Sequence, residues 1–77
     1  MRSKHRMKEF VVFKGVRFVV QEVNGEMVYR DEAHLGGPWS SAIGSINNSS
    51  INLKFRKLLA KAVARLTEGK HSVNNPI

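Results

Sequence analysis

The sequence predicts an α+β fold: a three-stranded antiparallel β-meander packed on one long C-terminal α-helix, with a short helical turn in the connection. Two observations lead to this prediction. Short β-favouring runs alternate with two-residue turn signals between Glu9 and Asp31. From Ile51 to Leu66, the apolar side chains recur at helical spacing and share one side of a helix.

Strands are expected at residues 9–13, 16–23 and 26–31, because these runs are rich in valine, phenylalanine and other β-favouring residues. Lys14-Gly15 is a plausible tight turn between the first two strands. Asn24-Gly25 is the strongest short hairpin signal, because a type I′ turn needs a positive φ at both central positions. Together these features predict an antiparallel meander.

Two-residue turns also fix the strand register, which decides which side chains share a face of the sheet. The turns place Val11 opposite Phe18, and Val20 opposite Tyr29. The face expected to meet the helix is apolar and carries Val11, Phe13, Val16, Phe18, Val20, Met27 and Tyr29. The second face is mixed and carries Phe10, Val12, Val19, Val23 and Val28 beside Arg17, Gln21 and Arg30. Either residues 32–50 or another chain should cover this second face.

Residues 32–50 connect the sheet to the helix and are rich in glycine, serine and asparagine. Three residues at helical spacing predict the short helical turn here: Trp39, Ile43 and Ile46. The main helix, expected at 51–66, should be capped by Ser50 or Asn48, whose side chains can accept hydrogen bonds from its first N–H groups. Gly69 is expected to stop the helix.

The chain has 77 residues, with 13 Lys and Arg against 6 Asp and Glu, which gives a formal net charge of +7. One domain is expected at 9–69, between a flexible basic arm at 1–8 and a flexible tail at 70–77. This charge on so short a chain argues for an anionic partner, either nucleic acid or an acidic protein surface. Solubility is the alternative explanation.

Nine cations are candidate nucleic-acid contacts: a row on the helix, the arm, and two arginines on the second sheet face. They are Lys54, Lys57, Lys61 and Arg65 on the helix, Arg2, Lys4 and Arg6 in the arm, and Arg17 and Arg30 on the sheet. Like charges at helical spacing repel each other, and bound phosphates would offset that repulsion. For each group, a solvated surface is the alternative. The first hypothesis is a small nucleic-acid-binding accessory or regulatory protein.

The second hypothesis is a protein-binding modulator, such as a small inhibitor of a larger enzyme, that docks its open sheet face, or adds its edge strand, on an acidic target. The expected interface is apolar and consists of Phe10, Val12, Val19, Val28 and Trp39. Trp39 alternatively anchors the connection onto the sheet. A homodimer through the same face is compatible with both hypotheses.

The expected architecture resembles, at the level of fold only, the small sheet-plus-helix DNA-binding domains of some integrases and plant regulators. A shared fold does not by itself imply a shared function. The resemblance implies only that a sheet-plus-helix domain of this size is able to bind DNA.

Neither an enzyme nor a cofactor or metal site is expected. The sequence has no nucleophile–base pattern, no glycine-rich phosphate loop and no cysteine. Asp31-Glu32-Ala33-His34 spells the DEAH box of helicases, but that box works only within a much longer nucleotide-binding core. Glu32 and His34 together are too few ligands to form a metal site. No apolar run is long enough to cross a membrane, and a cytoplasmic protein is expected.

Overall fold

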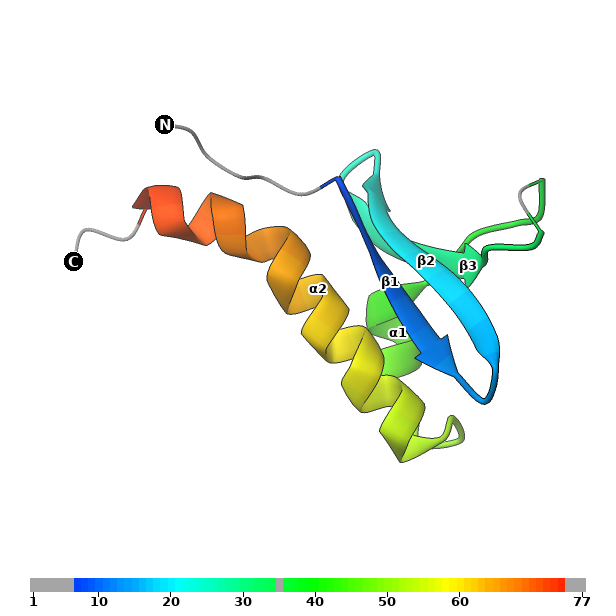
Figure 1. Ribbon diagram of the computed structural model, residues 1–77. Helices are drawn as coiled ribbons and strands as arrows, with labels where there is room; N and C mark the ends of the chain where they lie inside the picture. The colour runs from blue at the N-terminus through cyan, green and yellow to red at the C-terminus, as the bar shows by residue number, and fades with distance from the viewer. Residues whose placement is uncertain (1–6, 35, 75–77) are drawn as a thin grey trace.

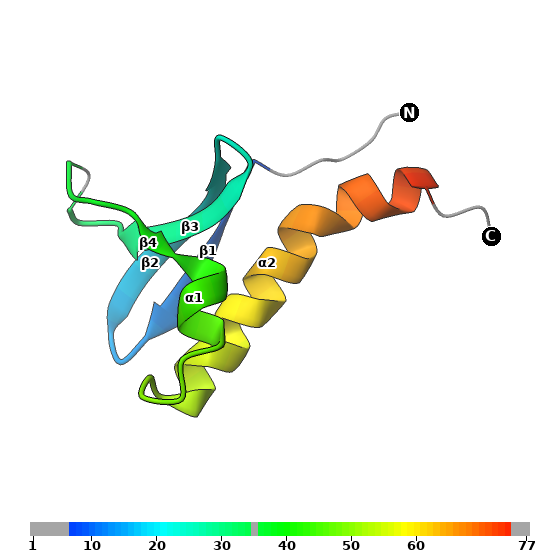
Figure 2. The same cartoon turned by 180° about the vertical axis from the view of Figure 1, so that it is seen from behind.

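The computed structural model describes residues 7–34 and 36–74, with side chains described as far as Thr67. It has the predicted α+β architecture, an antiparallel sheet with both helices on one of its faces (Figures 1 and 2). The sheet order is β1-β2-β3-β4. The elements are β1 (Lys8–Phe13), β2 (Val16–Val23), β3 (Glu26–Asp31), β4 (Ser40–Ser41), α1 (Ala42–Ile46) and α2 (Leu53–Asn74).

Both predicted two-residue turns are present, and the type I′ conformation predicted for Asn24-Gly25 is found at Lys14-Gly15 as well. The φ angles are 51° and 79° at Lys14 and Gly15, and 52° and 85° at Asn24 and Gly25. Positive φ at both central positions is what a type I′ turn requires, and it matches the twist of the flanking strands. The predicted register is confirmed, with Val11 opposite Phe18 and Val20 opposite Tyr29.

The core lies between the first face of the sheet and α2, as predicted. Its buried members are Val11, Val20, Phe55, Leu59, Ala62 and Leu66. The ring of Phe55 on α2 lies 5.3 Å from that of Phe13 and 5.0 Å from that of Phe18. Val16, which was also expected in the core, is 37% exposed. It follows the first turn directly and therefore sits at the end of the sheet.

The sheet has a fourth strand that the sequence analysis missed. β4 pairs antiparallel with the middle of β3. The helical turn predicted from Trp39 onward therefore starts later, because Trp39 precedes β4 and α1 begins at Ala42. Ser41 is the N-cap of α1, and its Oγ accepts a hydrogen bond from the Gly44 N–H at 3.0 Å.

The N-terminal cap of α2 also differs from the prediction. Asn52, and neither Ser50 nor Asn48, caps the helix: its Oδ1 accepts from the N–H groups of Lys54 at 2.8 Å and Phe55 at 3.3 Å. Asn48 instead accepts from the Ser50 N–H at 2.9 Å, within the preceding turn. Several capping residues lie close together here, so spacing alone does not select the one that caps.

At its other end, α2 continues through Gly69 to Asn74, so the predicted stop at Gly69 is wrong. Glycine in a helix interior costs about 1 kcal/mol relative to alanine, which a helix can tolerate. Residues 70–74 of the predicted flexible tail therefore belong to α2. The remaining tail, 75–77, and residues 1–6 of the predicted arm lie outside the described residues.

Candidate nucleic-acid interface

Three cations of the predicted helix stripe form an exposed row on α2. Lys54, Lys57 and Lys61 are all exposed, and their spacing puts them on one side of the helix. Within the described side chains, no acidic group forms an ion pair with any of the three. We call these three residues the lysine row. Their charges are available to a partner.

Arg65, the fourth member of the predicted stripe, contacts the protein itself. Its Nε donates a hydrogen bond to Oε1 of Glu9 at 2.9 Å. Glu9 lies on β1 on the face toward α2 and is only 7% exposed. Arg65 therefore balances a buried carboxylate and is less available to an outside anion than the lysine row. One feature of the sequence points to this contact: side chains alternate along β1, so Glu9 lies on the same face as the core residue Val11.

The two arginines of the second sheet face also have partners within the chain. The guanidinium carbon of Arg17 lies 4.1 Å from the centre of the Phe10 ring, and its Nε lies 3.3 Å from Oε1 of Glu32. Such stacking of a guanidinium on a ring is attractive, although weak when exposed. Arg17 is thus only partly available to phosphates.

Arg30 is held more firmly than Arg17. Its guanidinium carbon lies 3.9 Å from the centre of the Trp39 ring, and its Nη1 donates to the carbonyl of Gly37 at 2.6 Å. Its buried Nε has no hydrogen-bond partner among the described residues. These contacts attach the start of β4 to β3, as expected if Trp39 anchors the connection.

The predicted apolar interface divides into a covered part and an open part. Val19 and Val28 are buried, although they face away from the helices. Val19 lies between Phe10 and Arg30 in the register of the sheet. Phe10 and Val12 on β1 are 38% and 63% exposed. The open part of the second face is therefore its β1 side.

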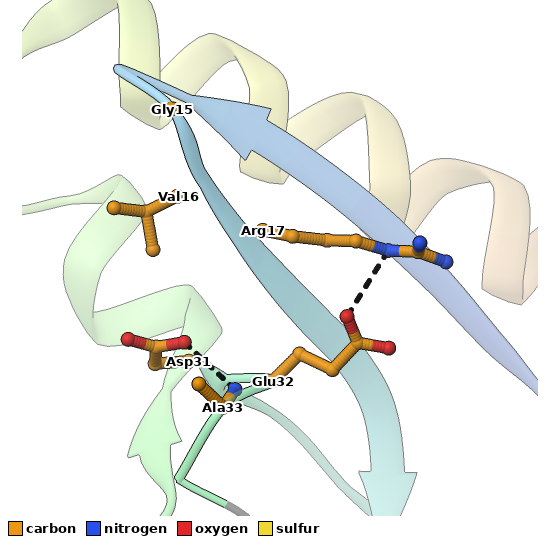
Figure 3. Close-up of a pocket in the computed structure, with 6 residues that line it drawn as sticks. All are labelled: Gly15, Val16, Arg17, Asp31, Glu32 and Ala33. Atoms are coloured by element: carbon orange, nitrogen blue, oxygen red, sulfur yellow. Dashed lines mark hydrogen bonds and ion pairs between the residues drawn. The ribbon is translucent and has the colours of Figure 1, made fainter.

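A pocket of about 600 Å³ lies where the first turn meets the end of β3 (Figure 3). It is lined by Gly15, Val16, Arg17, Asp31, Glu32 and Ala33. Figure 3 shows Arg17 and Glu32 joined along one side of the pocket. Asp31 accepts from the Ala33 N–H at 2.9 Å and lies 3.3 Å from Nδ1 of His34. Because its charged groups pair with one another, the pocket offers no free cation to a phosphate.

The DEAH-like segment, Asp31 to His34, forms the last residue of β3 and the turn that follows it. In the described parts of the chain, no group of three or more histidine, aspartate or glutamate side chains is placed to hold a metal ion. Arg2, Lys4 and Arg6, the candidate contacts of the arm, lie outside the described residues. Among the predicted contacts that the structure describes, the lysine row thus has the fewest partners inside the protein.

No protein-family model, curated protein or solved structure matches this chain. No helix in the described residues combines the length and the apolar character needed to cross a membrane.

Proposed function

We propose that this chain is a small nucleic-acid-binding protein, with an accessory or regulatory role, that contacts phosphates through the lysine row. The observation that carries the proposal is the row itself, Lys54, Lys57 and Lys61, exposed on α2 and without an acidic partner among the described side chains. The opposite side of α2 is fixed in the core by Phe55 and Leu59. The charges are therefore presented by a rigid element.

The dimensions suit a nucleic-acid backbone. Lys54 and Lys61 are separated along the helix axis by about 10 Å, at about 1.5 Å per residue. Phosphates of one strand of a duplex follow each other about every 3.4 Å along its axis, so the row spans roughly three of them. Contacts of this kind position a protein on nucleic acid but do not read its sequence. We therefore expect binding with little sequence preference.

The test is to measure binding to a random-sequence duplex and to a single strand, by fluorescence anisotropy, between about 50 and 200 mM salt. Three neutralised phosphates predict a slope of log K against log salt near −2.7 for a duplex, with the arm adding to it. Lys57→Glu combined with Lys61→Glu should abolish binding. The matched control compares single variants: Lys14→Glu changes the net charge as much as Lys57→Glu does, at an exposed lysine outside both the arm and α2.

Two results would contradict the proposal. The first is a wild-type chain that binds neither duplex nor single strand at low salt. The second is a control variant that loses as much affinity as the row variant, because binding would then depend on overall charge rather than on α2.

The protein-binding modulator remains the second candidate, and one observation favours it: Phe10 and Val12 are exposed on the second face. Exposed apolar side chains side by side are typical of protein interaction sites. If the chain binds no nucleic acid at low salt, this candidate is the better one. A homodimer through the same face stays a prediction for either function.

A further inference from the structure

β1 is the outermost strand on one side of the sheet. It pairs with β2 alone, and within the described residues no other segment pairs with its outer edge (Figure 1). An uncovered edge strand presents a row of backbone N–H and C=O groups that can pair with another chain. This edge runs for six residues, whereas β4 at the opposite edge has two.

The turn geometry shows which backbone groups of β1 face outward. Phe13 and Val16 flank a two-residue turn and form a hydrogen-bonded pair, so the backbone groups of Phe13 point toward β2. Hydrogen-bonded and non-hydrogen-bonded pairs alternate along an antiparallel ladder. The N–H and C=O groups of Lys8, Phe10 and Val12 therefore point away from the sheet.

The pairing of β2 with β3 gives the same assignment of outward-facing backbone groups on β1. Arg17 lies opposite Val12, and its carbonyl accepts the Glu32 N–H at 2.9 Å on the β3 side. Arg17 therefore directs its backbone groups away from β1, and Val12 directs its own groups outward.

Exposed apolar side chains gather along the same edge. Four of the six exposed large hydrophobic residues in the described part of the chain lie on β1 or next to it in sequence or in the sheet: Met7, Phe10, Val12 and Val16. Phe10 and Val12 belong to the outward-facing set and lie on the second face. A strand added beside β1 would bury both side chains and pair their backbone groups.

On the helix side, the same edge is bordered by positive charge. α2 runs alongside β1 in the opposite direction, since Phe55 packs on Phe13 and Arg65 reaches Glu9 (Figure 1). α1 lies on the other side of α2, below β3 and β4 (Figure 2). The flank of α2 that carries Arg65 therefore faces the free edge of β1.

Two residues of the lysine row lie on that flank. Lys61 is four residues and Lys54 eleven residues before Arg65, about one and three helical turns, so both point the same way as Arg65. Lys57 lies farther around the helix, away from the sheet. A strand added to β1 would thus have Phe10 and Val12, with Lys8 beyond them, on one face and the lysines of α2 on the other.

We propose that β1 binds an extended segment of a partner protein by antiparallel strand addition, and that apolar and acidic side chains alternate along this segment. Its apolar set would pack on Phe10 and Val12, and its acidic set would approach Lys54 and Lys61. Main-chain hydrogen bonds supply the affinity in this binding mode, and the alternating side chains supply the specificity. Antiparallel addition continues a sheet that is antiparallel throughout its described strands.

A second copy of the chain is a poorer occupant of this edge. Pairing of β1 with β1 across a two-fold axis would bring the two lysine-bearing flanks of α2 together. Like charges placed face to face oppose association, whereas an acidic segment is attracted. Charge complementarity therefore favours the acidic partner.

The test uses a fluorescent synthetic peptide of roughly nine residues in which valine and glutamate alternate, a normal strand length. Binding is measured in the absence of nucleic acid, so the result does not depend on the proposed function. The control peptide has the same composition with its valines grouped together. We expect the alternating peptide to bind at least about tenfold more tightly, because only alternation places each kind of side chain on its own face.

Two N-methylated peptides locate the hydrogen bonds without changing the protein. In antiparallel addition, the valines share the face of Phe10 and Val12 and direct their N–H groups toward β1. Methylation of the valine nitrogens should abolish binding, and methylation of the glutamate nitrogens should leave it intact. The reverse pattern, or equal effects of the two, would overturn the proposal.

Two protein variants test the charged border. Lys61→Glu should weaken peptide binding about three- to tenfold, because it places a negative charge beside the acidic set. Lys57→Glu has the same net charge, but its side chain lies away from the edge and should have no effect. This contrast also separates peptide binding from nucleic-acid binding, in which both lysines take part. Equal effects of the two variants, or no binding of the alternating peptide at low salt, would overturn the proposal.

Discussion

At the scale of single residues, the ion pair between Glu9 and Arg65 removes one cation from the row that the sequence predicts as a phosphate-binding surface on α2. The two residues are far apart in the sequence, yet their side chains meet at 2.9 Å. Helical spacing alone gives Arg65 the same role as the lysines before it. The contact gives it a structural role, since it neutralises a carboxylate that is almost fully buried.

We expect Arg65→Met to lower the free energy of unfolding by about 1–2 kcal/mol, because the buried carboxylate of Glu9 loses a charged hydrogen bond. Lys61→Met, at an exposed position on the same flank, should change it by less than about 0.5 kcal/mol. Urea denaturation measures both values. In a double-mutant cycle, Glu9→Gln should remove most of the effect of Arg65→Met. Equal effects in the two backgrounds would contradict a structural role for this pair.

At the scale of single elements, local signals place the strands and turns well, and they place the ends of the helices less well. The turn at Asn24-Gly25 follows from residue type, because asparagine and glycine both adopt positive φ readily, whereas at Lys14-Gly15 only the glycine carries this signal. The start of α2 does not follow in this way. Asn48, Ser50 and Asn52 are all residue types that can cap a helix. The packing of α2 on the sheet decides which of the three becomes its N-cap.

We expect Asn52→Ala to destabilise the protein by about 1 kcal/mol, because the N–H groups of Lys54 and Phe55 lose their shared acceptor. Ser50→Ala removes a hydroxyl in the preceding turn and should change stability by less than about 0.5 kcal/mol. Thermal denaturation followed by circular dichroism measures both. A larger effect at Ser50 would mean that α2 starts earlier than described.

At the scale of the whole molecule, one aromatic cluster joins the sheet to α2. The ring of Phe55 lies within 6 Å of the rings of Phe13, Phe18 and Tyr29, which come from all three long strands. Tyr29 also hydrogen-bonds Ser45 of α1 at 2.7 Å. The sheet and both helices therefore share a single core, and neither layer is expected to be stable without the other.

This shared core predicts cooperative unfolding. Trp39 directly precedes β4 and stacks on Arg30 of β3, so its fluorescence reports on the sheet, whereas circular dichroism near 222 nm is dominated by α2. The two signals should give coincident urea transitions, as expected for a small two-state domain. A circular dichroism transition at a lower urea concentration than the fluorescence transition would contradict this prediction, because the sheet would then be stable without α2.

Local patterns in the residue order predict the three long strands, their register, the apolar side of α2 and the exposed position of the lysine row. These features follow from interactions between residues that are close in sequence: two-residue turns, alternation along strands and helical spacing. The type of fold follows as well, because an apolar sheet face and an apolar helix face leave few ways to bury both.

The remaining features depend on contacts between elements and are visible only in the folded chain. The pairing of β4 with β3, the contact of Arg65 with Glu9 and the stacking of Arg30 on Trp39 join residues from different elements. Such contacts depend on how whole elements are positioned in space, which residue order does not specify. The same holds for the free edge of β1, because a strand is known to be an edge only when every neighbour in the sheet is placed.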